Sequence, residues 1–362
     1  MTVLRWLGSL MILLMGLVLL IVSHHHPEFA AWYAANIFPV FPYTLGWFFG
    51  WFPFSVFEIL LIFMALSLLG GIVFVAVNLF SRSGRAKLIA KAKIVPLRIF
   101  YMLSIALLLF VLTAGINYNR ESYADHIGII VQDSSTDELI RLYLLLVERA
   151  VLLADQIETD AEGHFALQRE GLYDYARQSM YNLNSLYGGL GTSFPRAKAP
   201  ILSRILLSNF NISGFFSPWT MEAHYNGDMP STSIPFVINH ELAHVAGQMR
   251  EDEANFAAYL ASRNASRVDF QYSAVYVALS YTLNALRRDV GRAQYAELYA
   301  LIPEQMQRDF AYARAYWRSF EGQAAELATR ANDAYLRLNQ QEDGIQSYGR
   351  MVDLLLAYYR GQ

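Results

Sequence analysis

The sequence has no cysteine and little charge, and each shortage excludes a class of protein. Without cysteine, the chain of 362 residues can form no disulfide, no thiolate metal site and no cysteine nucleophile, so any metal must use His, Asp or Glu. Charged residues make up 16% of the chain, against about a quarter in ordinary soluble domains. Because this is too little charge to cover a globule of that size, a simple cytosolic enzyme is excluded. Disorder is excluded too, because 23 Tyr, 23 Phe and 6 Trp supply ample surface for burial.

The charge is distributed unevenly along the chain. Residues 1–116 hold seven basic and two acidic residues, a charge of +5, whereas the remainder holds 21 basic and 29 acidic residues, a charge of −8. The acidic remainder has no basic stripe that could follow a phosphate backbone. Nucleic acid is therefore not expected as a partner.

Three uncharged apolar runs stand in the first third of the chain. They cover Trp6–Val22, Ile59–Phe80 and Ile99–Ile116, which are 17, 22 and 18 residues long. At about 1.5 Å per helical residue these lengths match a hydrocarbon core of roughly 30 Å. We therefore expect a membrane domain over 1–116, with transmembrane helices at about 6–22, 56–80 and 99–116. A cleaved signal peptide is the alternative for the first run, although this run is longer than the usual apolar core of about 7–15 residues.

The loops between these runs predict the topology. Residues 81–98 contain six basic residues and no acidic one, whereas residues 23–54 contain no Lys or Arg. By the positive-inside rule, the 81–98 loop and the N-terminus are cytoplasmic, and everything after residue 116 lies outside. The 23–54 loop is rich in Trp, Tyr and Phe and is broken by prolines, so we expect short helical pieces along the outer membrane interface.

The remaining residues, 117–362, predict a mostly helical extracytoplasmic domain. Helices are expected over 139–157, where Ser135 and Glu138 form a capping box, and over 172–186, 201–207, 269–286 and 311–338. Residues 212–235 are rich in Gly, Ser, Pro and aromatics and predict a small strand or loop region. The fold class is therefore mainly α.

One motif points to chemistry. His240, Glu241 and His244 form HExxH at the start of the next helical stretch. On a helix, positions i and i+4 share a face, so both imidazoles can bind one tetrahedral zinc, and Glu241 can take a proton from an attacking water. An ordinary surface helix with two histidines is the competing interpretation. The apolar residues 234–238 weigh against it, because they would bury the helix.

A third metal ligand is expected in the acidic cluster that follows. Gly247 is placed to end the first helix in a left-handed turn and to bring the chain back. Glu251 or Glu253 can then complete a His, His, Glu site, but the two lie about 200° apart on a helix, so at most one faces the metal. Acidic residues in a first helical turn also oppose the macrodipole, whether or not a metal is near.

The order HELAH, a short gap and E-x-E-A-N-F resembles the gluzincin kind of zincin metallopeptidase. The resemblance implies that Glu251 is the third ligand. It also implies that Asn255 does not bind the metal itself but orients a ligand through its side-chain amide. Two departures stand out: only six residues separate His244 from Glu251, and Arg250 occupies the place of the third His of a metzincin.

A closer likeness covers most of the chain. The three apolar runs, PFS at 53–55 and HELAH followed by EANF resemble the bacterial membrane family catalogued as domain of unknown function 3810. The resemblance brings no established activity. It implies a membrane-anchored zinc peptidase. Together with the three apolar runs, we expect a multi-pass protein of the bacterial inner membrane.

Further residues are expected to handle the substrate. Residues 214–226 could supply an edge strand that holds a peptide by backbone pairing. The donor that stabilises the transition state is left open among Tyr225, His224, Arg250 and Tyr272.

These features predict a membrane-anchored zinc (Zn²⁺) peptidase that hydrolyses a peptide or protein substrate in the cell envelope. The alternative is an inactive envelope sensor or binding protein, with a closed structural zinc site whose fourth ligand is His224 or His164. The substrate and the oligomeric state stay open.

Overall fold

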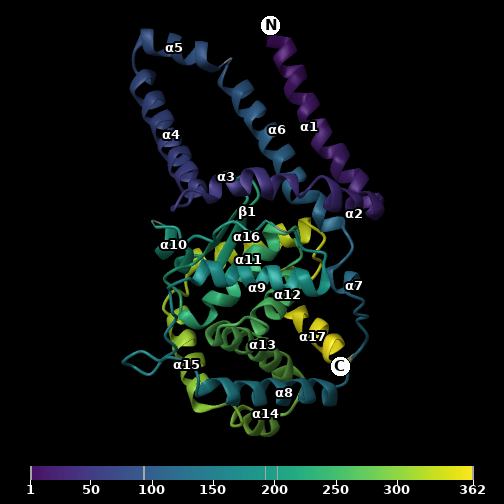
Figure 1. The fold of residues 1–362 in the computed structure, drawn as a ribbon. Helices are drawn as coiled ribbons and strands as arrows, with labels where there is room; N and C mark the ends of the chain where they lie inside the picture. Colours follow the sequence, from purple (N-terminus) through teal and green to yellow (C-terminus); the bar gives the residue numbers. More distant parts are fainter. Residues whose placement is uncertain (1, 93, 192, 202, 361–362) are drawn as a thin grey trace.

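Three long apolar helices rise from one end of the molecule (Figure 1). The computed structural model describes residues 2–92, 94–191, 193–201 and 203–360. The helices are α1 (Thr2–His25), α4 (Val56–Leu79) and α6 (Val95–Thr113). The described chain has three helical spans that are long and apolar enough to cross a membrane, as the sequence predicted. The basic loop forms helix α5 (Arg82–Ala92) between α4 and α6.

The third span ends earlier than expected. The sequence predicts a helix up to Ile116, but α6 ends at Thr113 and a 3₁₀ turn follows over Gly115–Asn119. Ala114 leaves the helical conformation with φ −140°. Packing explains the earlier end of the helix. Ile116 is fully buried in the core of the domain, and a helix that continued past Thr113 would move Ile116 out of this core.

The aromatic outer loop joins the membrane helices to that domain. It forms α2 (Pro27–Asn36), a π-helical turn (Pro42–Gly46) and α3 (Trp47–Gly50), in agreement with the short helical pieces expected. Phe38 packs in the same hydrophobic core as the helices of the domain, and Lys198 donates a hydrogen bond to the carbonyl of Phe49 at 2.7 Å. The loop is therefore also a wall of the domain.

The rest of the chain is mainly helical with one small sheet, as expected. Its helices are α7 (Tyr123–His126), α8 (Thr136–Ala154), α9 (Leu172–Tyr187), α10 (Ser203–Asn209), α11 (Ile234–Val245), α12 (Glu251–Arg263), α13 (Val268–Asp289), α14 (Arg292–Tyr299), α15 (Glu304–Arg318), α16 (Gln323–Leu338) and α17 (Met351–Arg360). The capping box at Ser135 and Glu138 is confirmed at the start of α8. Helix α13 contains the uncharged run after Asp269 and is buried along much of its length, so this run is a core helix.

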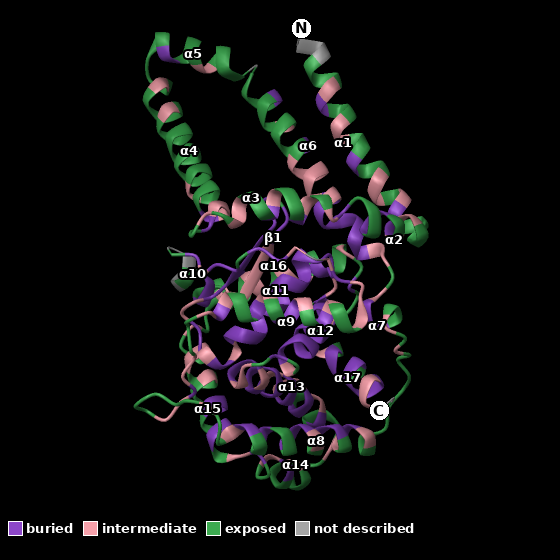
Figure 2. Ribbon diagram, in the orientation of Figure 1, coloured by how far each residue is buried: buried purple, intermediate pink, exposed green. Residues whose placement is uncertain are grey.

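Two antiparallel strands form the sheet. β1 (Gly214–Ser217) pairs with β2 (Glu222–Tyr225), and Gly214 lies opposite Tyr225. The two strands lie within the region that the sequence predicted as strand or loop. Both contact α11, and Figure 2 shows that the buried residues concentrate around α11, α12 and α13, whereas α4 is exposed.

The stretch 311–338 is two helices instead of one. Helix α15 ends at Arg318 and α16 begins at Gln323. The hydroxyl of Ser319 donates to the carbonyl of Tyr316 at 2.6 Å, and Gly322 stands at the start of α16. Such side-chain bonds compete with helix continuation, which explains the break.

Candidate metal centre

Helix α11 carries the HExxH residues into the interior of the domain. Pro235 lies in its first turn, where a missing N–H costs nothing, and all residues of the helix are buried. His240 and His244 lie one turn apart, with their ring centroids 4.6 Å apart. The competing interpretation of an ordinary surface helix is therefore wrong.

The chain reverses directly after α11. Gly247 has φ +90°, the left-handed conformation predicted for it, and its N–H donates to the carbonyl of His244 at 2.9 Å. The N–H of Gln248 donates to the carbonyl of Ala243 at 3.0 Å. A β-carbon at position 247 would lie only 2.9 Å from the ring of Phe38, so glycine is required on two grounds. This turn brings α12 back against α11.

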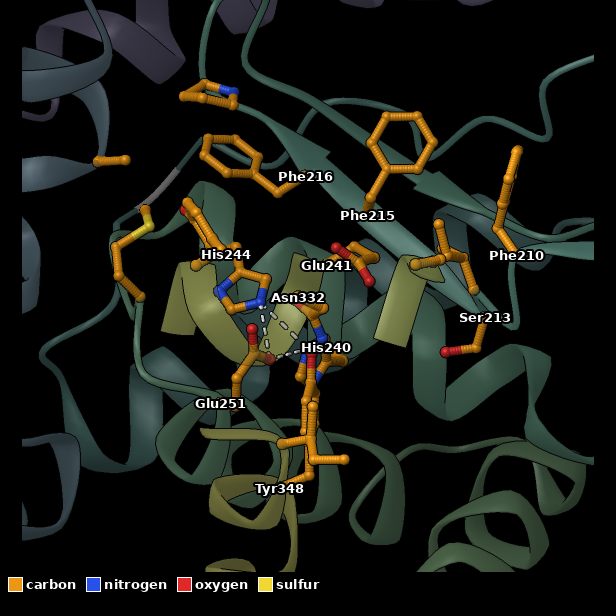
Figure 3. Close-up of a pocket in the computed structure, with 18 of the residues that line it drawn as sticks. Phe210, Ser213, Phe215, Phe216, His240, Glu241, His244, Glu251, Asn332 and Tyr348 are labelled. Atoms are coloured by element: carbon orange, nitrogen blue, oxygen red, sulfur yellow. Dashed lines mark hydrogen bonds and ion pairs between the residues drawn. The ribbon is translucent and has the colours of Figure 1, made fainter. Parts of the chain in front are cut away.

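The reversal places Glu251, the first residue of α12, against both histidines (Figure 3). Its Oε2 lies 3.1 Å from Nε2 of His240 and 3.5 Å from Nε2 of His244, and the two Nε2 atoms are 3.1 Å apart. The backbone N–H of Glu251 donates to the side-chain oxygen of Gln341 at 3.0 Å. The C-terminal part of the chain thus fixes the start of α12.

These three side chains fit a tetrahedral metal ion. Ligand atoms about 2.0–2.1 Å from such an ion lie about 3.3–3.4 Å apart, close to the three distances above. Nδ1 of His244 lies 2.7 Å from the carbonyl of Gln248 and can donate its proton to it, which would leave Nε2 for a metal ion. The Oε2 atom of Glu251 is buried and has no hydrogen-bond donor. A cation would satisfy all three atoms.

Glu241 is not part of this cluster, although it lies beside it. Its carboxylate is buried, and its Oε2 has no hydrogen-bond partner. Strand β1 passes so close that a β-carbon at Gly214 would lie 2.5 Å from Oε1 of Glu241. Glycine at this position therefore lets the strand run directly past the carboxylate.

A cavity of about 660 Å³ opens over the cluster. Figure 3 shows Phe215 and Phe216 of β1 on one side of the histidines and Tyr348 on the opposite side. The wall between membrane and domain also contributes, through Phe110 of α6 and Ala114. The cluster is thus accessible, and a ligand can reach it along β1.

Burial and mutual charge shift the ionisation of the site. Burial lowers the pKa of His240 and raises the pKa of Glu241 to about 8. Burial also acts to lower the pKa of His244, but the nearby Glu251 carboxylate outweighs it and raises that pKa to about 9. For Glu251, burial acts to raise the pKa, but the two histidines outweigh it and lower the pKa below its usual range.

Glu253, the alternative third ligand, points elsewhere. Its Oε2 accepts a hydrogen bond from the N–H of Ala124 at 3.0 Å, and its Oε1 lies 3.8 Å from the guanidinium of Arg250. The two glutamates thus occupy different faces of α12, as helical geometry required. Arg250 is engaged with Glu253 and does not line the cavity, so it is no candidate for a donor to the substrate.

The two tyrosines predicted as donors also lie away from the cavity. The hydroxyl of Tyr225 lies 3.1 Å from that of Tyr173, and the hydroxyl of Tyr272 donates to Asp309 at 2.7 Å. Both hydroxyls are used inside the fold. These two predictions are therefore corrected.

Neither candidate fourth ligand joins the cluster. Nε2 of His224 lies 2.8 Å from the hydroxyl of Ser55, and His164 stacks on Tyr312 with ring centroids 4.3 Å apart. Among the residues that the structure describes, the group of His, Asp and Glu side chains close enough together to hold a metal ion consists of His240, His244 and Glu251. All three side chains line the cavity.

Asn255 lies beside the site, where its side chain interacts with His240. Its amide donates to the carbonyl of Tyr348 at 3.1 Å, not to Glu251. It therefore holds the 3₁₀ turn Gly344–Arg350, and with it Tyr348, next to His240, whose ring centroid is 6.4 Å from that of Tyr348. Tyr348 and Asn332 both line the cavity. Sequence reasoning missed them, because no motif surrounds them.

Comparison with known proteins identifies the family. No curated protein and no solved structure matches the chain. One family profile does match, over residues 33–356, which include most of the outer loop, two of the apolar helices and the cluster of His240, His244 and Glu251. The chain therefore belongs to the family described as protein of unknown function DUF3810.

Proposed function

We propose that this protein is a membrane-anchored, zinc-dependent peptidase with a zincin-like domain. The observation that carries the proposal is the set of three ligand atoms 3.1–3.5 Å apart, with a fourth position open to the cavity and Glu241 beside it. A catalytic zinc site has this form, with three protein ligands and one open position.

The residues have separable roles in peptide hydrolysis. Zinc held by His240, His244 and Glu251 would supply a Lewis acid that polarises the scissile carbonyl and activates water. Glu241 takes the proton of the attacking water and delivers it to the leaving amine. Burial raises its pKa to about 8, and a general base works best with a pKa near the working pH.

Two further elements support a peptide substrate. Within the described chain, β1 pairs with β2 on one side and with no strand on the other, and Ser213, Gly214, Phe215 and Phe216 line the cavity. An extended peptide can pair with this free edge. On the opposite side, burial raises the pKa of Tyr348, so its hydroxyl stays protonated and can donate to the developing oxyanion.

We place the domain on the outer side of a bacterial inner membrane, with the N-terminus in the cytoplasm. The support is the charge of the loops, because six basic residues lie in the 81–98 loop and none in 23–54. Reporter fusions after Gly84 and after Glu138 should report the inside and the outside. If both report the same side, the three-span topology is wrong.

The alternative of an inactive envelope sensor with a structural zinc is less well supported. A structural zinc site is normally closed by four protein ligands. His224 and His164, the histidines considered for the fourth position, are engaged with Ser55 and Tyr312. The described cluster thus has the ligand number of a catalytic site.

The test is zinc analysis and peptide hydrolysis on the purified full-length protein. We expect about one zinc in the wild type, Glu241→Gln and Tyr348→Phe, because the three ligands are kept in all of them. Glu241→Gln should abolish cleavage, and Tyr348→Phe should lower it about 100-fold, as for the loss of one oxyanion donor. Wild-type protein without zinc would end the proposal. Zinc in all proteins with no cleavage by the wild type would favour the sensor.

A further inference from the structure

The turn between β1 and β2 reaches the level of the membrane helices. The indole N–H of Trp219 donates to the carbonyl of Ala106 in α6 at 3.1 Å. Its ring also stacks on Phe57 in the first turn of α4, with centroids 5.8 Å apart and ring planes 8° apart. The turn therefore bridges the bases of two apolar helices (Figure 1).

These contacts fix the height of the metal site above the membrane. Ala106 lies seven residues before the end of α6 at Thr113, which is about 10 Å along the helix. From Trp219 back to Gly214 the chain covers five residues, at most about 17 Å. Gly214 touches Glu241, so the site lies within roughly 10 Å of the outer end of α6.

The cavity opens toward that end of the molecule. Its lining includes Phe110 and Ala114 at the end of α6, and Pro218 and Trp219 of the turn. Helix α6 packs along α1, whereas the apolar part of α4 has no residue buried against the rest of the protein (Figure 2). The space between α4 and α6 is thus open to lipid above the turn that Trp219 occupies.

We propose that the substrate is the segment of a membrane-anchored polypeptide that directly follows its anchor. This inference rests on the proposed peptidase function and names the class of substrate. Strand β1 runs from the site toward the membrane, so a peptide paired with its free edge would have one end directed to the space between α4 and α6. The anchor of the substrate would occupy this space.

A polypeptide fits the site better than a lipid does. The free edge of β1 offers backbone donors and acceptors at the spacing of an extended chain, beside Glu241 and the three ligands. A lipid head group has no such repeat. An extended chain rises about 3.3 Å per residue, so a height of roughly 10 Å corresponds to about three residues, and the cleaved bond would lie at least that far beyond the anchor.

The first test measures binding without catalysis. The chain has no cysteine, so Ser213→Cys in the Glu241→Gln background adds one thiol at the start of β1, and Ser266→Cys on the exposed surface is the matched control. Each full-length protein is placed in lipid nanodiscs with a single-span substrate. The unstructured tail of the substrate carries one cysteine, at about 5, 10, 20 or 30 residues from the membrane span of the substrate.

We expect disulfide formation with Ser213→Cys to be at least about tenfold greater at 5 than at 30 residues, and no such dependence with Ser266→Cys. Equal yields at all spacings, or equal yields with a soluble peptide of the same sequence, would overturn the inference. Labelling of Ser213→Cys by a thiol-reactive phospholipid, with no disulfide to any substrate, would overturn it in favour of a lipid ligand.

The second test separates this inference from the peptidase function. Wild-type protein is given the same cleavable sequence close to a span, far from a span and as a soluble peptide. Preferential cleavage of the first supports both proposals. Equal cleavage of all three refutes the inference and leaves the peptidase function intact. The spacing-dependent disulfide together with no cleavage refutes the peptidase function and retains binding of an anchored chain.

Discussion

Glu222 and Lys198 form a buried ion pair that should hold helix α4 to the domain, and breaking it should be costly. The carboxylate of Glu222 accepts hydrogen bonds from the N–H groups of Val56 and Phe57, at 3.0 and 2.9 Å. Lys198 donates to the same carboxylate at 2.6 Å, and both side chains are almost fully buried. The pair thus satisfies two backbone N–H groups in the first turn of the apolar helix α4 from the side of the domain.

The expected magnitude follows from this burial. Removing one partner of a buried pair leaves an uncompensated charge and costs about 3–5 kcal/mol, so Lys198→Met and Glu222→Met should each lose about that much. The double variant leaves no lone charge. It leaves two backbone N–H groups without partners, at about 1–3 kcal/mol each. The carbonyl of Phe49 loses Lys198 but still accepts a hydrogen bond from the N–H of Phe52 at 3.2 Å. The total cost of the double variant should therefore be well below the sum of the two single costs.

The measurement is the free energy of unfolding of the full-length protein in detergent, followed by tryptophan fluorescence. Arg330 and Glu326, an exposed pair 3.8 Å apart on α16, are the control, and breaking them should cost less than about 1 kcal/mol. Single losses at Glu222 and Lys198 no larger than in this control would refute the reasoning. Strict additivity in the double variant would refute it as well.

Three further predictions concern the ligands, the pH dependence and a helix cap. Glu251→Ala should lose zinc, whereas Glu253→Ala should keep zinc and lose only stability. Zinc analysis and thermal unfolding of both variants measure the two effects. The reverse result would make Glu253 the ligand. Burial lowers the pKa of His224 to about 4 from 6.5. The stability that the neutral histidine gives to the folded state is therefore fully present above pH 6.5 and is lost as the pH falls through 4, a total of roughly 3 kcal/mol in the free energy of unfolding. Unfolding midpoints measured from pH 7 to 4 should fall less in His224→Gln, and an unchanged slope would exclude this histidine as the cause. Ser135→Ala removes the cap of α8 and should cost about 1 kcal/mol in denaturant unfolding, and no measurable change would show that the capping box contributes nothing.

The placement of the ligands could be predicted because it depends on local geometry. The spacing of His240 and His244 fixes their common face on any helix, and Gly247 forces the reversal that follows. The resemblance favoured Glu251 over Glu253, and Glu251 is the glutamate that lies with the two histidines. The N–H of Ala124 and the guanidinium of Arg250 hold Glu253 on the other side of α12.

The cavity-lining residues Tyr348 and Asn332 could not be predicted, because their positions depend on contacts distant in sequence. Tyr225 and Tyr272 lie in plausible places along the chain, but their hydroxyls are satisfied by Tyr173 and Asp309 inside the fold. The backbone carbonyl of Tyr348 accepts a hydrogen bond from Asn255, which lies 93 residues earlier, and its hydroxyl accepts one from Asn332. No local pattern marks such a residue.

The same dependence on distant contacts governs the junction with the membrane. The outer loop was expected to lie along the lipid, and yet Phe38 belongs to the core of the domain and packs against the turn at Gly247 that positions Glu251. Ser55, at the start of α4, lies against His224 of β2, the strand that pairs with the strand beside Glu241. Removing residues 1–116 would therefore withdraw the contacts of both Phe38 and Ser55 from the elements around the metal site. Zinc content and cleavage should accordingly be measured on the full chain, because loss of either in an isolated domain would follow from these missing contacts alone.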